Sequence, residues 1–120
     1  MKRLYFKLNT DVIKEGDLGD CAYIVEAGSL EVSKINNQNN KQVLGQLKEN
    51  DIFGELGLID GLPRSATVTA LESCTIKVLT RDSFHSLARN RPEALMPIFK
   101  VLASRLRSTL KQLIGVPNHG

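Results

Sequence analysis

The sequence predicts a mainly β fold with helices at its C-terminus, and three observations support this prediction. Residues 1–80 contain short segments in which apolar and polar side chains alternate, as expected of half-buried strands. Turn signals containing glycine or asparagine separate these segments at short intervals, which favours a sandwich or a barrel. From Thr80 onward the apolar positions recur every three or four residues instead, which indicates helices.

Seven segments of the first 80 residues have strand character, either by alternation or by richness in β-forming residues. A tight turn at Ala27–Gly28 predicts that the third and fourth segments form a hairpin. The polar tract 36–40 predicts an exposed loop, and Asn50 suits a turn because asparagine tolerates positive φ. The segments are residues 4–8, 12–13, 21–28, 29–35, 42–47, 65–71 and 74–80.

Two helices are predicted after the last strand. Thr80 or Asp82 can cap the first helix, which should stop near residues 90–91 because Pro92 follows. Pro92 itself suits the first turn of a longer second helix, and Gly115 with Pro117 would end that helix.

An apolar stripe runs along the second predicted helix. It either packs on the core of its own chain or pairs with a second copy of the chain. We favour packing over a stable dimer, because about three heptads are short for a coiled coil. The stripe consists of Leu95, Phe99, Leu102, Leu106, Leu110 and Leu113.

Composition and charge exclude several classes of protein. The net charge of +3 divides into −2 for residues 1–80 and +5 for residues 81–120, and we assign the basic excess to a solvated helix face rather than to nucleic acid. No run of about 18 apolar residues indicates a membrane span, and no signal peptide is recognisable. Cys21 and Cys74 are far apart in sequence, so reduced thiols in the core, no metal site and a cytoplasmic location are expected.

Catalytic motifs are not recognisable, and we expect no enzymatic activity. His85 and His119 have no partner fixed by a motif, and Asp17 and Asp20 stand at turns, where aspartate is common. Hydrolase, metalloprotease and nucleotide-hydrolysing signatures are missing from the sequence.

The segment 53–70, FGELGLIDGLPRSATVTA, has the composition of a pocket for a small anion. Glycines near Glu55 allow a close approach of the backbone to a ligand. A short helix starting near Glu55 would direct free N–H groups toward an anion, and Arg64 has the planar donors that suit a phosphate. Glu55 would repel phosphate, so it is expected to accept a hydrogen bond from a hydroxyl of the same ligand. A structural Glu55–Arg64 salt bridge without ligand is the alternative.

This segment closely resembles the phosphate-binding cassette of the cyclic-nucleotide-binding domains of catabolite-activator-type regulators, cyclic-nucleotide-dependent kinases and gated channels. A second matching pattern, E-G-D-x-G-D-x-x-Y-I-V-x-x-G, begins at Glu15 and ends at Gly28. The resemblance implies an eight-stranded jelly-roll-like β-roll (double-stranded β-helix) with a short cassette helix and two C-terminal helices. The cassette pattern is met at Phe53, Gly54, Glu55, Leu56, Leu58, Arg64, Ser65, Ala66, Thr67 and Val68.

The resemblance also implies roles for single residues. Glu55 would bind the ribose 2′-hydroxyl, and Arg64 would pair with the exocyclic oxygens of the cyclic phosphate. The Ser65 hydroxyl would add a further bond to the phosphate. The resemblance implies that backbone N–H groups complete the phosphate site, and these belong to Gly54, Leu56, Ser65 and, as a further candidate, Ala66.

The contact with the base is left open between several residues. Thr109 matches the position that binds adenine in the catabolite activators, with Ser108 beside it. Arg105 or Arg107 could act as the corresponding cation of the channels, and a solvated helix face is an equal alternative for all of these positions. Val43 and Tyr23 could flank the base from the β-roll.

We therefore expect one cyclic-nucleotide-binding domain over residues 1–120, with a β-roll over 1–80 and helices over 81–115 that act as a lid or a dimer contact. The expected ligand is a 3′,5′-cyclic nucleotide, with cAMP favoured over cGMP and the choice between them left open, and its binding would move the C-terminal helices and signal to an unknown effector. The alternative is a ligand-free interaction or dimerisation domain. Little chain follows the long helix, so we expect no DNA-binding motif here, and a piece of a larger receptor is a further alternative.

Overall fold

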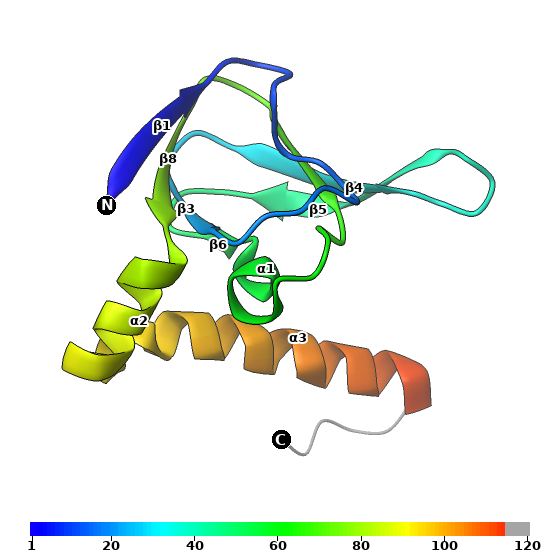
Figure 1. Ribbon diagram of the computed structural model, residues 1–120. Helices are drawn as coiled ribbons and strands as arrows, with labels where there is room; N and C mark the ends of the chain where they lie inside the picture. Colours follow the sequence, from blue (N-terminus) through cyan, green and yellow to red (C-terminus); the bar gives the residue numbers. More distant parts are fainter. Residues whose placement is uncertain (115–120) are drawn as a thin grey trace. The chain divides into compact units, whose positions relative to one another are not determined.

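The computed structural model describes residues 1–114, and this part of the chain contains two four-stranded antiparallel sheets (Figure 1). The first sheet has the order β1 (Lys2–Phe6), β8 (Cys74–Leu79), β3 (Ala22–Ala27), β6 (Ile52–Phe53). The second sheet has the order β2 (Asp11–Ile13), β7 (Thr67–Ala70), β4 (Leu30–Ile35), β5 (Lys41–Leu47). The predicted mainly β fold with eight strands and C-terminal helices is confirmed.

The core consists of side chains from both sheets. Strand β8 shows the pattern that builds it, because Cys74, Ile76 and Val78 are buried while Thr75 and Lys77 are partly exposed. This is the period of two that the sequence predicts for a half-buried strand. The central cluster is formed by Val25, Leu30, Phe53, Val68, Ala70, Cys74 and Ile76.

The predicted hairpin at Ala27–Gly28 is wrong. Strand β3 pairs with β6 and β8, whereas β4 pairs with β5 and β7, so the two strands lie in different sheets. Gly28 has a φ of 98° and carries the chain from one sheet to the other. A tight glycine turn between two alternating segments is the same local signal in both arrangements, because only long-range pairing decides which sheet each strand joins.

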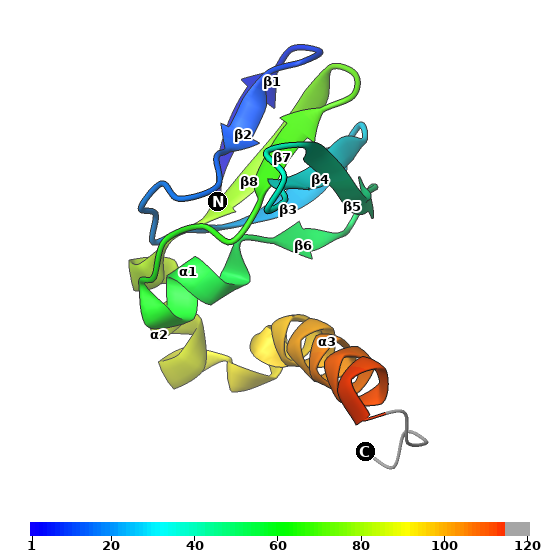
Figure 2. The same cartoon turned by 90° about the vertical axis from the view of Figure 1, so that its right-hand side faces the viewer.

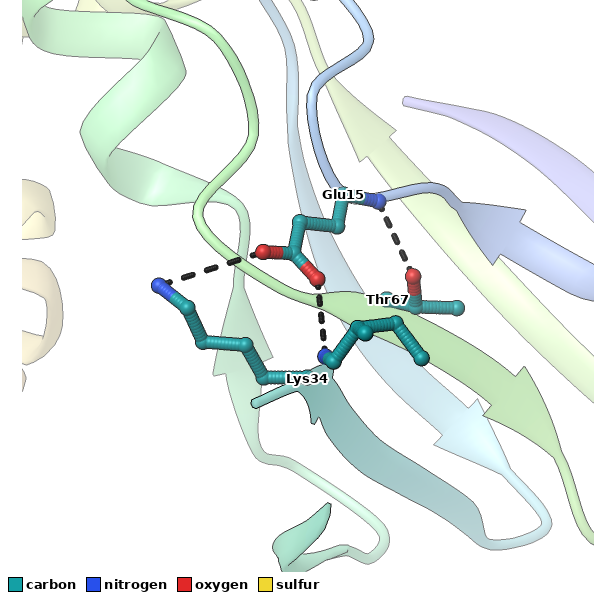
Figure 3. Close-up of polar contacts among 4 residues, drawn as sticks. Glu15, Lys34 and Thr67 are labelled. Carbon is teal, nitrogen blue, oxygen red and sulfur yellow. Dashed lines mark hydrogen bonds and ion pairs between the residues drawn. The ribbon is translucent and has the colours of Figure 1, made fainter. Parts of the chain in front are cut away.

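The turn after β2 is tied to two strands of the second sheet (Figure 3). The N–H of Glu15 donates to the Thr67 hydroxyl at 2.9 Å, while its carboxylate accepts from the Ile35 N–H at 3.1 Å and lies 3.9 Å from Lys34 Nζ. The side chain of Thr67, a residue of the cassette pattern, therefore links the turn after β2 to strand β7.

The polar tract between β4 and β5 is an exposed loop, as predicted. Asn36 Oδ1 accepts hydrogen bonds from the N–H groups of Gln38 at 2.9 Å and Asn40 at 3.0 Å, which closes the loop locally. Asn39 in this loop has a φ of 62°, and Asn50 in the turn before β6 has a φ of 74°. Asparagine therefore occupies the left-handed position in each of these two turns.

The first C-terminal helix, α2 (Arg81–Asn90), begins with a threonine cap. The Ser83 N–H donates to Thr80 Oγ1 at 3.1 Å, which identifies Thr80 rather than Asp82 as the capping residue.

The second helix differs from the prediction in its first turn. Residues Pro92–Leu95 form a 3-10 turn, η1, and the α-helix α3 (Met96–Ile114) follows it. Pro97 has no N–H to donate to the Glu93 carbonyl, which accepts from the Met96 N–H instead, three residues on. The predicted helix end at Gly115 and Pro117 lies outside the described residues.

The contacts divide the chain into two compact units, one of residues Met1–Ser83 and one that begins at Phe84. In the second unit Leu95 and Ile98 are buried, whereas Phe99, Leu106 and Leu110 of the predicted stripe are exposed by 47%, 61% and 48%.

Within residues 1–114, no helix combines the length and the apolar character that a membrane crossing requires.

Candidate functional site

The centre of the cassette is a six-residue helix, α1 (Glu55–Asp60), which follows β6 directly and contacts β3 (Figure 2). Glycines in the left-handed conformation stand at both of its ends, Gly54 with a φ of 73° and Gly61 with a φ of 68°. The Gly61 N–H closes the helix by donating to the Gly57 carbonyl at 3.0 Å. Other residues are strained at such φ values, so these two glycines determine where the helix begins and ends.

The guanidinium of Arg64 is buried next to this helix, with 6% of the residue exposed. Its Nη1 donates to the Gly54 carbonyl at 2.8 Å and its Nη2 donates to the Cys21 carbonyl at 2.9 Å. A guanidinium has five N–H donors, so these two bonds fix its orientation and leave capacity for the oxygens of an anion.

The backbone of Arg64 is fixed by the turn after β2. The Gly16 N–H donates to the Arg64 carbonyl at 2.8 Å, and the Arg64 N–H donates to the Asp17 carbonyl at 2.8 Å. Together with the bond from Glu15 to Thr67, these contacts pair the turn 15–17 with the segment 64–67. The two patterns that the sequence shows separately, at residues 15–28 and 53–70, therefore meet at Arg64.

Two further glycines, Gly19 and Gly57, make room for the guanidinium, a role that is not predicted from the sequence. A Cβ atom at Gly19 would lie 2.6 Å from Arg64 Nη2, and one at Gly57 would lie 2.7 Å from Arg64 Nη1. Both distances are far below van der Waals contact, so any larger residue would displace the arginine. The glycines of the two sequence patterns could have indicated this space for the arginine side chain.

Tyr23, which the sequence suggests as a flank of the base, lies against the Arg64 guanidinium. Its ring stacks on Phe53 with centroids 5.2 Å apart, and Arg64 Cζ lies 5.6 Å from its centroid. Burial raises the pKa of the Tyr23 phenol, and the nearby Arg64 charge opposes this shift. The phenol is therefore neutral at physiological pH.

The acidic member of the cassette is completely buried. Glu55, the first residue of α1, is 0% exposed, while Leu56 is 44% exposed and Ser65 is exposed as well. Burial of a carboxylate and a guanidinium is costly for folding unless both are well paired. A segment that carries both groups can bind a ligand that has an anion and a hydroxyl close together.

The residues expected to contact a base are placed on two different elements. Val43 lies on β5 and is 54% exposed. Arg105, Arg107 and Thr109 lie on α3 and are exposed, and the Thr109 hydroxyl donates to the Arg105 carbonyl at 3.0 Å. Their role toward a base stays a prediction.

Both cysteines are free thiols, as predicted, but only Cys74 belongs to the core, because Cys21 is partly exposed. Cys74 is buried and donates to the carbonyls of Ser29 and Glu72, each at 3.2 Å, and burial raises its pKa. Within residues 1–114 no group of three or more His, Cys, Asp or Glu side chains could hold a metal ion.

Comparisons with known proteins agree with this geometry. The sequence model of the family described as "Cyclic nucleotide-binding domain" matches residues 3–91. The cAMP-dependent protein kinase regulatory subunit of Yarrowia lipolytica is 44% identical over 78 residues, which are 65% of this chain and 20% of that protein.

Solved structures show the same fold. The catabolite activator protein of Thermus thermophilus superposes with a TM-score of 0.89 at 28% identity, over 93% of this chain and 53% of that one. The regulatory domain of Toxoplasma gondii PKA, crystallised with cAMP, gives a TM-score of 0.66 at 38% identity, over 71% of this chain and 32% of that one.

This chain thus spans about a fifth of the kinase subunit and about half of the activator. The family match includes the turn 15–17, the glycines at 19 and 57 and the whole cassette, which confirms the resemblance seen in the sequence. The chain belongs to the cyclic nucleotide-binding domain family.

Proposed function

We propose that this chain is a sensor module that binds a 3′,5′-cyclic nucleotide, cAMP rather than cGMP, and has no catalytic activity. The observation that carries the proposal is the buried Arg64, which is held by carbonyls and surrounded by glycines in a segment that also buries Glu55. The preference for cAMP is supported by the relatives, since the kinase subunit is named as cAMP-dependent and the PKA domain was crystallised with cAMP. A cytoplasmic location stays a prediction from the sequence.

The ligand would be recognised at its phosphate and its sugar. Arg64 would pair with the exocyclic phosphate oxygens, since a fixed guanidinium donates to two oxygens at once. Glu55 would accept a hydrogen bond from the ribose 2′-hydroxyl. The Ser65 hydroxyl is exposed and available to the phosphate. The backbone N–H groups that would complete the phosphate site are those of Gly54, Leu56, Ser65 and Ala66.

Binding would be read out by the C-terminal helices. A ligand that binds one arrangement of residues 81–114 better than another shifts the population toward it. The boundary between the two units, within α2, supports such a division of roles. The exposed Phe99, Leu106 and Leu110 favour a second candidate function, a homodimer through the helix 92–114.

Titration of the chain with cAMP and with cGMP in a calorimeter tests the sensor function. We expect saturable binding of one nucleotide per chain, with the higher affinity for cAMP. If neither nucleotide gives heat up to millimolar concentration, the chain is not a sensor, and a ligand-free dimerisation domain becomes the better description. Sedimentation of the same sample would then test for the dimer.

Glu55→Ala is expected to abolish the distinction between cAMP and 2′-deoxy-cAMP. A hydrogen bond to a charged acceptor contributes about 1.5–3 kcal/mol, so the native chain should prefer cAMP over the deoxy analogue by about ten-fold or more. The variant should bind both ligands with equal affinity in the calorimeter. Because both ligands meet the same cavity in the variant, their ratio is insensitive to any general loosening of the site. An unchanged preference in the variant would show that Glu55 does not bind the 2′-hydroxyl.

Gly19→Ala is expected to weaken cAMP binding nearly as much as removal of Arg64. The added Cβ would lie 2.6 Å from Nη2 and 2.7 Å from Nε of Arg64, and the flexible arginine is the group that must move. Affinity should fall by about ten-fold, the value of a charge-assisted bidentate pair. Calorimetry measures this loss, and thermal unfolding checks that the variant is folded. Native affinity in a folded Gly19→Ala variant would show that the guanidinium position does not matter.

A further inference from the structure

The proposed function gives no role to Tyr23, although this side chain lies in the site. It comes from β3, outside the cassette, yet its ring lies against two cassette residues. Phe53 stacks on it with an interplanar angle of 23°, and Arg64 Cζ lies 5.6 Å from the ring centroid. The ring therefore contacts both an aromatic residue of the core and the guanidinium.

The contact with Tyr23 matters because Arg64 also borders open space. A cavity of about 210 Å³ is lined by both Tyr23 and Arg64, together with Val12, Ile13 and Leu18 among others. Carbonyls hold the guanidinium at Nη1 and Nη2, and the glycines at 19 and 57 leave room for it. In addition to these contacts, Arg64 Cζ lies over the ring of Tyr23.

An aromatic ring suits this position for an electrostatic reason. The face of the ring carries negative potential and attracts a cation within about 6 Å of the centroid, more strongly where water is excluded. A guanidinium also stacks on flat rings, which a lysine ammonium does not do. The face of the ring therefore stabilises the buried charge of Arg64.

We propose that Tyr23 is a positioning residue for phosphate recognition, whose ring supports the Arg64 guanidinium in the geometry that binds the phosphate of a cyclic nucleotide. This inference rests on the proposed function. Without the ring, the guanidinium can tilt into the enlarged cavity, and its donors lose their alignment with the phosphate oxygens. Arg64 also hydrogen-bonds to the Tyr23 phenol, which acts to lower the pKa of the phenol, and the proposal assigns the effect on affinity to the ring rather than to this hydroxyl.

The test compares the affinity for cAMP of Tyr23→Leu and Tyr23→Phe by calorimetry. Tyr23→Leu should lose about three- to thirty-fold, the range of a partly to fully desolvated cation–π contact. Tyr23→Phe should stay within about two-fold of the native chain, because it keeps the ring. Tyr5→Leu is the matched control, since Tyr5 is 76% exposed on β1 of the same sheet and should bind cAMP like the native chain.

A second comparison separates positioning from mere stability. In the Arg64→Ala background, Tyr23→Leu should cause no further loss of affinity, because the group that it positions is absent. An additional loss as large as in the native background would overturn the proposal, and so would native affinity of Tyr23→Leu. An equal loss in Tyr23→Phe would assign the effect to the hydroxyl and would also overturn it.

Fluorinated phenylalanines at position 23 keep the proposal testable if Tyr23→Leu does not fold. Successive fluorine atoms withdraw electron density from the ring and weaken its negative face with little change in shape. Affinity for cAMP should fall stepwise with the number of fluorine atoms, and a constant affinity would contradict the proposal. If the native chain itself does not bind cAMP, the proposed function fails, which is a different result from native binding that is insensitive to position 23.

Discussion

Replacing Arg64 by alanine is expected to weaken cAMP binding by at least about ten-fold, the largest effect on affinity of any single change in this chain. A charge-assisted bidentate pair contributes roughly 1.5–3 kcal/mol, and alanine removes it completely. The variant also leaves the carbonyls of Gly54 and Cys21 without their donor, so a loss of about 1–3 kcal/mol in the free energy of unfolding should accompany it. Calorimetry and chemical denaturation measure the two effects.

Two controls identify the source of the loss. Arg64→Lys keeps the charge and loses the planar fork, so its affinity should lie between those of the native chain and Arg64→Ala. Arg3→Ala removes an arginine that is half-exposed and pairs with Glu26 on the surface, and it should bind cAMP like the native chain. Native affinity in Arg64→Ala would remove the arginine from the binding site.

Replacing Gly28 by alanine is expected to be the most destabilising small change. Gly28 has a φ of 98°, and a Cβ there would lie 2.7 Å from Cys74 Sγ, 2.8 Å from the Ser73 carbonyl oxygen and 3.0 Å from Cys74 Cα. The left-handed backbone costs about 1–2 kcal/mol for any other residue, and overlap with packed neighbours costs about 1–3 kcal/mol more. A total near 3 kcal/mol should lower the thermal midpoint by about 10 °C.

Gly45→Ala is the matched control for this change. A Cβ at Gly45 meets no atom within 4 Å, and its φ lies outside the left-handed region. Alanine in a strand is more favourable than glycine by roughly 0.5–1 kcal/mol, so the control should be as stable as the native chain or slightly more. Equal thermal midpoints for the two variants would show that the turn between the sheets has room for a side chain.

The same glycine shows where prediction from the sequence stops. Alternation in residues 21–28 and 29–35 identifies two strands correctly, because burial on one face of a sheet has a period of two. It cannot tell that β3 and β4 belong to different sheets, since their partners β8 and β7 are distant in the sequence, as in the pairs Ala22–Leu79 and Ser33–Thr67. Local patterns determine the elements, and long-range pairing determines the topology.

The same limit applies to the candidate site, where local patterns identify some residues and long-range contacts determine the roles of others. Glu55 and Arg64 stand out in the sequence because charges are costly in an apolar, glycine-rich segment. The roles of Gly19 and Tyr23 depend on contacts with Arg64 over 40 residues or more, and no spacing rule connects them. The 3-10 turn before α3 follows from Pro97, which has no N–H to donate to the Glu93 carbonyl.

Amide chemical shifts during titration with cAMP test most directly whether the cassette binds the nucleotide. In a proton–nitrogen correlation spectrum of the labelled chain, the N–H signals of Gly54, Leu56 and Ser65 should move the most, and Gly16 and Gly19 should follow because they contact Arg64. The loop 36–40 should not respond. Saturable binding that leaves residues 53–66 unchanged and shifts signals elsewhere would contradict the site.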